Sequence, residues 1–559
     1  MSQRSGRFVA VIALLFEFLA ALPDAAQSGP SATELAVQVR TESGLLKGAR
    51  FGDKANELMF LGIPYAAPPI GPRRWMPPQS PVSWTGVRDA DAFGASCMQQ
   101  DKWPADTASY YATLPSLKHY AGYHTSEDCL YLNVWSTNVG GAKPLPVMVW
   151  IHGGGNVGGT GELSPLGPAL ARRGVVLVSM NYRLGVFGFT AHPALTAESP
   201  HHASGNYGLM DQIASLEWVQ RNIGVFGGDP RNITVMGSSA GGVNICYLMA
   251  SPLARGLFHR AIVESNGCAD YFVPELTRVT AFYGGTDSSE AAGVRLAHRL
   301  GVDGGPDVLA QLRAKSAEEV LQATDPAGFF DGMVDGYVIP EQPAIVFAAG
   351  RQAAIPLLLG SNADEAALFV DDAPKTIPDY QRWLQKDFGE DWKTIFDAYP
   401  AKSDAEAPKV WDAMLTDYEF GSSTYQLAQA QRRINQPVHF YYLTYPAKAG
   451  MGKYAGRAYH GIELNFLSNV FPRPSKWEQD AADLKLAETM GEYWTRFAST
   501  GDPNGHGLQN WPPYDPGTNQ VLELGHEVRI VGMPHLDRYA VFMKVLAKKF
   551  ADRMAAQRK

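Results

Sequence analysis

Short, almost continuous apolar runs recur along the chain, and longer stretches with helical spacing separate them. Most of these runs contain β-branched residues; they occupy residues 147–151, 175–180, 233–236, 261–264, 356–360 and 438–444. Short runs with little polar alternation are typical of strands that are buried on both faces of a sheet. Residues 211–222 and the segment after Ser239 have helical character, so strands and helices alternate. The pattern predicts an α/β fold with a large, mostly parallel central sheet flanked by helices.

Neither an internal repeat nor a low-complexity linker divides the chain after its first residues. One elaborated domain over residues 33–550 is therefore favoured over two separate ones. Two long intervals, about 270–350 and 370–435, are rich in helix-forming residues and turns. We expect them to be helical insertions that form a cap or the wall of a gorge.

The first residues have the pattern of an export signal. Arg4 and Arg7 precede an apolar run over 8–22, and Ala25 and Ala26 follow it. The run is shorter than the roughly 20 apolar residues that a membrane-spanning helix needs. It predicts a signal peptide over 1–26 and a secreted or periplasmic protein without stable membrane insertion. An uncleaved anchor or an incorrect start site is the alternative, because Glu17 and Asp24 are atypical of such a segment.

Composition narrows the function classes. The chain has 559 residues, of which 45% are hydrophobic and 19% charged, as in a compact globular protein. A net charge of -8 without a basic stripe argues against nucleic acid as a partner. The four cysteines lack metal-ligand spacing, and we expect no metal and no cofactor. An oxidising compartment would allow these cysteines to pair.

Residues 237–241 read Gly-Ser-Ser-Ala-Gly and follow the apolar run at 233–236. A helical segment comes next, so this G-x-S-x-G pattern stands between a strand and a helix, the context in which it presents a nucleophilic serine. Glycines at both ends allow a sharp turn that lifts the Ser239 hydroxyl above the sheet. The alternative, a tight strand-to-helix turn without chemistry, is disfavoured by this context.

A second glycine motif follows another predicted strand. Residues 152–155 read His-Gly-Gly-Gly directly after the run at 147–151. Successive free N–H groups can stabilise the oxyanion that develops when an ester carbonyl is attacked. Glycines at a strand end are more often simple turns, but their combination with the Ser239 motif favours an oxyanion hole.

A serine nucleophile needs a histidine base and an acid that orients it, in the order Ser, acid, His. Asp364 and Glu365 follow the predicted strand at 356–360, at the end of a parallel strand where catalytic groups are presented. His460 lies in a glycine-bounded loop after the run at 438–444 and is the favoured base. The alternative bases are His506, His526 and His535. Packing or surface roles are expected for His259, His298 and His439.

Several longer stretches resemble the type-B carboxylesterase family, which includes cholinesterases and bacterial para-nitrobenzyl esterases. Phe-Gly-Gly-Asp-Pro at 226–230, leading into 237–241, is similar to the family's nucleophile signature, and 127–134 is similar to its second signature. Further similar stretches are 60–66, 181–185, 205–209 and 494–498. The resemblance spans about residues 40–525 and implies the α/β-hydrolase fold.

The resemblance also assigns roles by position. It implies a triad of Ser239, Glu365 and His460, which favours Glu365 over Asp364 as the acid. It implies oxyanion donors at the backbone N–H groups of Gly154, Gly155 and Ala240. A disulfide between Cys97 and Cys129 and a buried ion pair between Arg74 and Glu127 are implied in the same way. Cys246 and Cys268 do not clearly match a second family disulfide, so both a bridge and two buried thiols stay open.

Three positions depart from the family pattern. Ser238 stands where the family usually has Glu before the nucleophile, so we expect a negative charge to be missing and the pH profile or acyl preference to differ. Asn156 replaces an aromatic or small residue after the glycines, and Ala366 replaces Gly after the acid. Both changes bear on the shape of the acyl pocket.

The expected function is hydrolysis of short to medium acyl or aryl esters through an acyl-enzyme on Ser239. The expected partner is a small-molecule ester substrate, and the sequence does not determine the oligomeric state. A lipase or a transacylase on the same site is an alternative, and a non-catalytic recognition domain is a distant one. The natural ester depends on pocket walls that come from the divergent insertions, because a fold does not fix a substrate.

Overall fold

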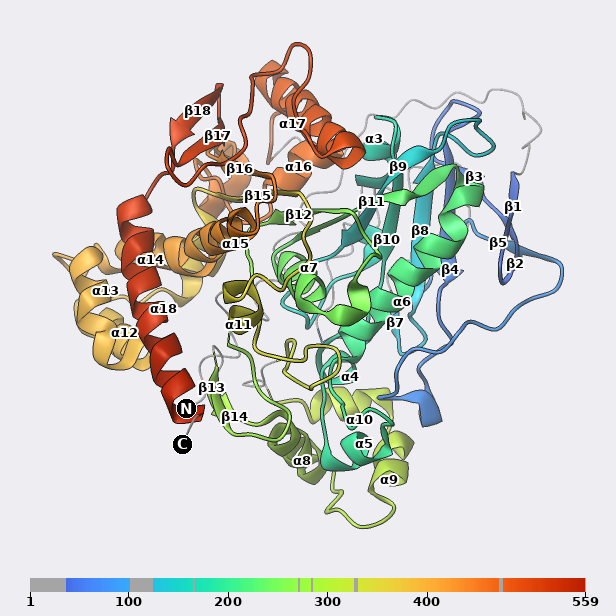
Figure 1. Ribbon diagram of the computed structural model, residues 1–559, viewed down its shortest axis with the longest axis horizontal. Helices are drawn as coiled ribbons and strands as arrows, with labels where there is room; N and C mark the ends of the chain where they lie inside the picture. The colour runs from blue at the N-terminus through green and yellow to red at the C-terminus, as the bar shows by residue number, and fades with distance from the viewer. Residues whose placement is uncertain are drawn as a thin grey trace.

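The computed structural model describes residues 37–557 except 101–123, 164–165, 270–271, 283–284, 326–329 and 472–475. The predicted signal peptide at 1–26 lies outside the described residues. A single large sheet runs through the described part of the molecule, and helices lie on both of its faces (Figure 1).

The large sheet has eleven strands in the order β18-β17-β16-β15-β12-β11-β9-β10-β8-β4-β3. Its centre is parallel and consists of β9 (Leu145–Ile151), β10 (Val176–Met180), β11 (Gly228–Ser238), β12 (Arg260–Glu264), β15 (Leu357–Asn362), β16 (Val438–Leu443) and β17 (Gln520–Leu524). Antiparallel strands complete both edges: β3 (Ala49–Arg50), β4 (Leu58–Pro64), β8 (Tyr131–Ser136) and β18 (Val528–Gly532). All six strands predicted from the apolar runs are present.

Small sheets lie outside the main one. They are formed by β1 (Gln38–Thr41), β2 (Gly44–Lys47) and β5 (Val87–Asp89), by β6 (Ser96–Cys97) and β7 (Thr125–Ser126), and by β13 (Thr280–Phe282) and β14 (Gly285–Asp287). The first of them lies beside the β3–β4 edge of the main sheet (Figure 1).

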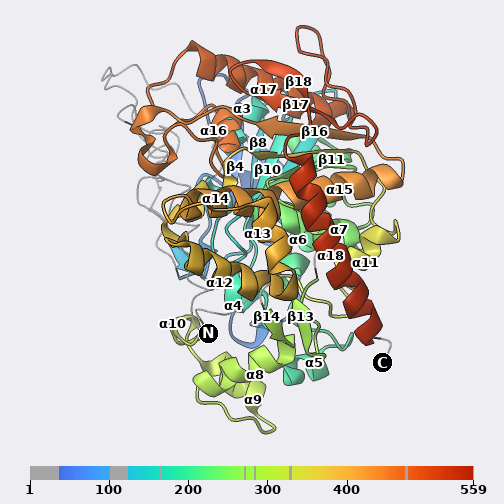
Figure 2. The ribbon, with the colours of Figure 1, turned by 90° about the vertical axis from the view of Figure 1, so that its left-hand side faces the viewer.

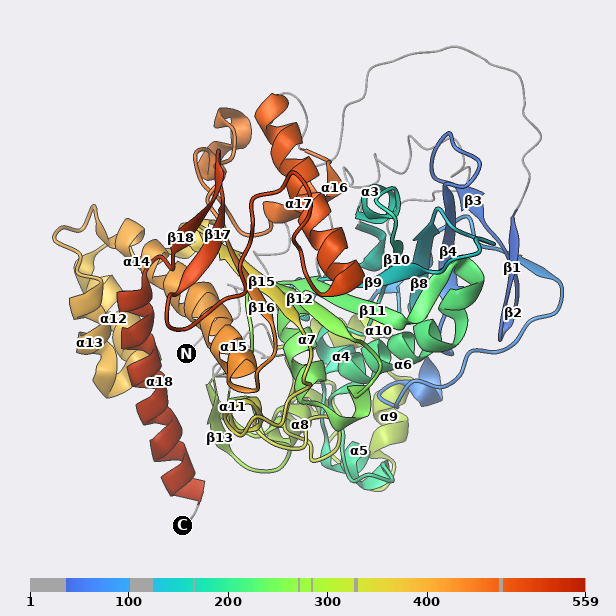
Figure 3. The ribbon, with the colours of Figure 1, turned by 45° about the horizontal axis from the view of Figure 1, so that its top comes forward.

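The central strands are apolar throughout because each contributes side chains to two hydrophobic cores, one on each face of the sheet. In β9, Val147 and Val149 pack into one buried cluster, whereas Met148 and Trp150 pack into another on the opposite face. Side chains alternate between the faces of a strand, so a strand covered on both sides cannot carry polar alternation. Figure 3 shows the helices that cover the faces: α6 (Tyr207–Asn222) and α7 (Ala240–Ala250) on one, α3 (Leu166–Ala171), α16 (Glu463–Ser468) and α17 (Ala481–Thr500) on the other.

The two predicted insertions are helical. The first contains α8 (Ser289–Arg299), α9 (Val308–Ala314), α10 (Ala317–Gln322) and α11 (Pro343–Ala348). The second contains α12 (Ile377–Phe388), α13 (Trp392–Ala398), α14 (Ala407–Leu415), a π-helical turn η8 (Thr416–Gly421) and α15 (Ser422–Arg433). The C-terminal helix α18 (Leu536–Gln557) packs across this second group, while α8 and α9 lie at the far end of the molecule beside α5 (Pro193–Glu198) (Figure 2).

The short α4 (Gly185–Gly188) follows β10. Within the described residues, no helix is both long and apolar enough to cross a membrane.

Two disulfides close loops near the sheet. Cys97 is bonded to Cys129 with a Cα–Cα distance of 4.9 Å, and Cys246 is bonded to Cys268 with a Cα–Cα distance of 5.6 Å. The sequence left open whether Cys246 and Cys268 form a bridge or are two buried thiols, and the structure contains the bridge. Each bridge contributes about 3 kcal/mol to stability if its main effect is to restrict the unfolded chain.

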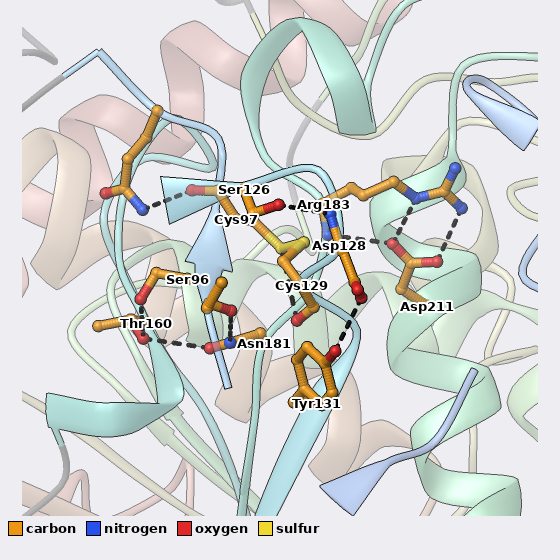
Figure 4. Close-up of a disulfide and its surroundings, with 12 residues drawn as sticks. Ser96, Cys97, Ser126, Asp128, Cys129, Tyr131, Thr160, Asn181, Arg183 and Asp211 are labelled. Atoms are coloured by element: carbon orange, nitrogen blue, oxygen red, sulfur yellow. Dashed lines mark hydrogen bonds and ion pairs between the residues drawn. A yellow bond between two sulfur atoms is a disulfide. The ribbon is translucent and has the colours of Figure 1, made fainter. Parts of the chain in front are cut away.

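Buried ion pairs flank the first disulfide. Figure 4 shows Arg183 and Asp211 beside it, with the guanidinium Nε 2.7 Å from the carboxylate and both side chains buried. Arg74 and Glu127 form the other pair at 2.5 Å, as the family resemblance implies. Because each pair makes two parallel hydrogen bonds, removing one partner would leave a buried charge unpaired, which is strongly destabilising.

Candidate active site

Ser239 stands at the sharp turn between β11 and α7. Its backbone has φ 60° and ψ -129°, a conformation that residues other than glycine seldom adopt. The turn is held because Ser239 donates its N–H to the Glu264 carbonyl at 2.9 Å, and its own carbonyl accepts from Val243 at 3.0 Å. Strained backbone of this kind concentrates at functional sites, where the surrounding structure keeps it in place.

The neighbouring glycines are required by close packing. A Cβ on Gly241 would lie 2.2 Å from the Ile151 carbonyl oxygen, so any side chain there would push α7 away from β9. A Cβ on Gly153 would lie 2.6 Å from the Ser238 carbonyl oxygen and 3.1 Å from the Ser239 Cβ. The glycine loop at 153–155 therefore packs directly against the Ser239 turn.

Two amides of this loop have no backbone acceptor. Gly154 and Gly155 have φ values of 110° and 60°, and neither N–H donates to a backbone carbonyl within the described part of the chain. The Gly154 carbonyl is used instead, accepting from Val157 and Gly158 at 3.1 Å each. Free N–H groups beside a serine are the arrangement that binds an oxyanion.

Glu365 and His460 are in contact and buried. Oε2 of Glu365 lies 2.6 Å from Nδ1 of His460, and the two side chains are 0% and 1% exposed. The other carboxylate oxygen of Glu365 accepts the Asn362 N–H at 2.7 Å, which fixes the direction of the carboxylate. A carboxylate at Nδ1 holds the imidazole in the tautomer whose Nε2 can accept a proton.

Asp364, the alternative acid, has another role. Its Oδ2 accepts the Ala458 N–H at 2.9 Å, and its own N–H donates to the Ala458 carbonyl at 3.0 Å. These bonds attach the loop before His460 to the end of β15. Asp364 therefore holds the histidine loop, whereas Glu365 contacts the histidine itself.

The alternative histidines have partners or surroundings elsewhere. His535 contacts Asp417, exposed His298 contacts Asp303, and His259 accepts from the Ile233 N–H. His526 packs on Tyr445, and His506 is exposed. His439 is buried, and neither ring nitrogen has a hydrogen-bond partner among the described residues. Burial lowers the pKa of His439 to about 4 and keeps it neutral.

A second buried carboxylate adjoins the nucleophile turn, and the sequence did not reveal it. Glu463, the first residue of α16, accepts from the Ser238 hydroxyl at 2.9 Å and from the Asn362 side chain at 2.6 Å. Burial and the neighbouring Glu365 raise the pKa of Glu463, which favours its neutral form. The place where the family usually has Glu is thus occupied by a serine that binds this carboxyl group. The position of Glu463 three residues after His460 was the only available signal.

Two residues from the insertions also reach the site. The ring of Phe420, on the π-helical turn η8, lies 4.9 Å from the His460 ring, and π-helical turns occur frequently at functional sites. Asp331 accepts a hydrogen bond from the Asn156 side chain at 3.1 Å. Burial raises the pKa of Asp331 to about 7. No local pattern marks either residue, because each contact joins segments that are distant in sequence.

The electrostatics of His460 lead to a pH prediction. Burial alone would lower the pKa of His460, but the charge and hydrogen bond of Glu365 outweigh it and raise the pKa above the ordinary 6.5. A general base must be neutral, so kcat/KM should fall as the pH drops through an apparent pKa higher than 6.5. The measurement is kcat/KM for a soluble para-nitrophenyl ester between about pH 5 and pH 9. An inflection at or below the ordinary value would contradict this reading of the site.

No cluster of His, Cys, Asp and Glu that could hold a metal ion occurs among the residues that the structure describes.

Comparisons with known proteins identify the family and the fold. A family model described as the carboxylesterase family matches residues 35–541. The chain is 37% identical over 506 residues to a fumonisin B1 esterase from Sphingopyxis macrogoltabida, covering 87% of this chain and 86% of that protein. It is 36% identical over 525 residues to a para-nitrobenzyl esterase from Bacillus subtilis strain 168, covering 89% and 97%. A solved carboxylesterase from Geobacillus stearothermophilus matches with a TM-score of 0.74 at 30% identity, over 90% of this chain and 99% of that one. The predicted α/β-hydrolase fold is confirmed.

Proposed function

The chain belongs to the carboxylesterase family and is a carboxylic ester hydrolase; from this premise we propose that Ser239, Glu365 and His460 form its catalytic triad. The buried contact of 2.6 Å between Glu365 and His460 is the observation that carries the assignment. The contact orients the imidazole, and the hydrogen bond of 2.9 Å from Ser238 to Glu463, three residues after His460, supports a position beside the nucleophile turn. The family match over 35–541 supports treating residues 33–550 as one catalytic domain.

In this mechanism, the Ser239 hydroxyl attacks the ester carbonyl while Nε2 of His460 accepts its proton. Glu365 keeps the imidazole in the required tautomer and stabilises its charged form. His460 then returns the proton to the leaving alkoxide, and an acyl-enzyme remains on Ser239. In the second half, His460 activates water, which releases the acid and restores the serine.

The tetrahedral oxyanion would be bound by the N–H groups of Gly154, Gly155 and Ala240. The N–H groups of Gly154 and Gly155 have no backbone acceptor among the residues that the structure describes, and Ala240 is the first residue of α7, where an N–H has no partner within the helix. Loss of one such donor typically raises the barrier by about 2.7 to 4 kcal/mol.

We propose short to medium acyl or aryl esters as the substrates. The name of the para-nitrobenzyl esterase says that this relative acts on an aryl-containing ester, and Phe420 offers an aromatic surface beside His460 here. The two disulfides fit an oxidising compartment, which supports the proposal of a secreted or periplasmic protein.

The substrate proposal is tested with para-nitrophenyl acetate, butyrate, octanoate and palmitate and with emulsified long-chain triacylglycerol. We expect kcat/KM to be highest for butyrate or octanoate and lowest for palmitate, with little activity on the emulsion. A preference for the emulsion would identify a lipase. Formation of a new ester in place of the free acid when an alcohol is added would identify a transacylase.

A further inference from the structure

The oxyanion loop is built from the residues with the greatest backbone freedom. Three successive glycines at 153–155 make room for the serine turn, but glycine also loses the most conformational entropy when its backbone is fixed. Oxyanion donors stabilise a transition state only if they are already in place when charge develops. Something outside the glycines must therefore hold the amides of Gly154 and Gly155.

Asn156, the next residue, is anchored through every polar position of its side chain. Its amide nitrogen donates to Asn244 Oδ1 at 3.2 Å and to Asp331 Oδ1 at 3.1 Å. Its amide oxygen accepts from Asn244 Nδ2 at 2.8 Å and from the Tyr182 hydroxyl at 3.3 Å. The side chain is buried, and both of its amide hydrogens are used. Its oxygen accepts from Asn244 and shares the single Tyr182 hydrogen with the His152 carbonyl.

These partners connect both ends of the loop to the catalytic framework. Asn244 belongs to α7, the helix that begins directly after Ser239. The Tyr182 hydroxyl also contacts the His152 carbonyl at 2.8 Å, and its ring stacks on His152 at 4.4 Å. The two residues that flank the glycines, His152 and Asn156, therefore share one rigid aromatic support.

The backbone of Asn156 explains the residue type. Its φ is 56°, in the left-handed region that asparagine tolerates better than most residues and glycine tolerates at no cost. Aspartate would place a second carboxylate against Asp331. The aromatic or small residue usual in the family would lack the amide that bonds Asn244.

We propose that Asn156 is a positioning residue for the oxyanion hole, which holds the amides of Gly154 and Gly155 against the nucleophile helix through its paired hydrogen bonds with Asn244. The proposal rests on the catalytic role assigned to these amides above. It gives the unusual residue after the glycine run a function in the reaction of this particular chain.

The first test is Asn156→Gly, which permits the same positive-φ backbone conformation but removes the side chain and its hydrogen bonds. The burst of para-nitrophenolate counts the active sites, and kcat per active site should fall by about 10- to 100-fold. This is the effect of displacing a catalytic group by a fraction of an ångström to 1 Å. KM should change little. The inhibition constant of an alkyl trifluoromethyl ketone, whose hemiketal carries an oxyanion, should rise by the same factor as kcat/KM falls.

Two further variants separate positioning from loss of packing. Asn244→Ala removes the partner, and the double variant with Asn156→Gly should be no slower than the slower single variant, because both act through one contact. Gln99→Leu breaks the two bonds of 3.0 Å that hold Gly159, three residues after Asn156, and leaves the Asn156 side chain in place. It should leave kcat and the inhibition constant near their wild-type values.

Equal losses in Asn156→Gly and Gln99→Leu would overturn the proposal in favour of general loosening, and so would an unchanged kcat and inhibition constant in Asn156→Gly. Additive losses in the double variant would overturn the role of Asn244. If the proposed catalytic serine is wrong, Ser239→Ala will keep the burst and the inhibition by the ketone that the wild-type enzyme shows. That result overturns both proposals and is distinguishable because it appears without any substitution at Asn156 or Asn244.

Discussion

Replacing Ser239 with alanine should lower kcat for para-nitrophenyl butyrate by about 10⁶-fold, because the attacking oxygen is lost and the acyl-enzyme cannot form. The neighbouring Ser238 hydroxyl should not replace it, because it donates to the Glu463 carboxyl group at 2.9 Å. Any residual rate should come from oxyanion stabilisation and substrate binding alone. The measurement is single-turnover and steady-state hydrolysis with protein whose melting temperature matches the wild type.

Ser238→Ala is the matched control for this prediction. It removes a hydroxyl one residue away, together with its hydrogen bond to Glu463, but leaves the nucleophile in place. We expect its kcat to stay within about tenfold of the wild type, the range of an ordinary buried hydrogen bond. A similar collapse in both variants would show that the turn, and not the Ser239 oxygen, is what the substitutions damage.

Glu365→Gln should lower kcat by about 10⁴-fold while the protein stays folded. The glutamine is the same size and can still form a hydrogen bond with His460 Nδ1. Because its amide nitrogen donates a hydrogen, it favours the imidazole tautomer with the proton on Nε2, which cannot accept the serine proton. It also removes the negative charge that raises the pKa of His460. Steady-state hydrolysis at several pH values measures both effects.

Asp364→Asn is the control, because Asp364 was the other candidate acid. An asparagine oxygen can still accept the Ala458 N–H that Asp364 accepts at 2.9 Å, so the histidine loop should stay attached. Activity within about tenfold of the wild type is expected, again the range of one altered hydrogen bond. A larger loss in Asp364→Asn than in Glu365→Gln would reverse the assignment of the acid.

The sequence predicted the parts of the site that depend on local chemistry. A strand covered on both faces has to be apolar, so six central strands could be recognised in the sequence as apolar runs. The turn at Ser239 and the loop at 153–155 were visible because close packing excludes side chains there, as the 2.2 Å approach at Gly241 shows. The edge strand β18 and the parallel strand β17 were not predicted, since their runs are short and partly polar.

The parts that the sequence left open depend on contacts between distant segments. Glu365 and His460 are 95 residues apart. The residues alone favoured His460 as the base but left His506, His526 and His535 open. Asn156 and Asp331 are 175 residues apart, and their hydrogen bond has no sequence pattern. The absence of Glu before the nucleophile suggested a missing charge. The sequence did not show that the carboxyl group of Glu463 from α16 lies beside that position, where its raised pKa favours the neutral form. Pairings of this kind follow from the tertiary fold and not from local propensity.

The most direct test of the central assignment is covalent labelling with a para-nitrophenyl alkylphosphonate. Intact-mass measurement should show one phosphonyl group per chain, with release of one para-nitrophenolate, and peptide mapping should place the group on Ser239. Ser239→Ala should remain unlabelled and Ser238→Ala should label normally. A phosphonyl group on any other residue, or a wild-type enzyme that hydrolyses esters but resists labelling, would contradict the assignment.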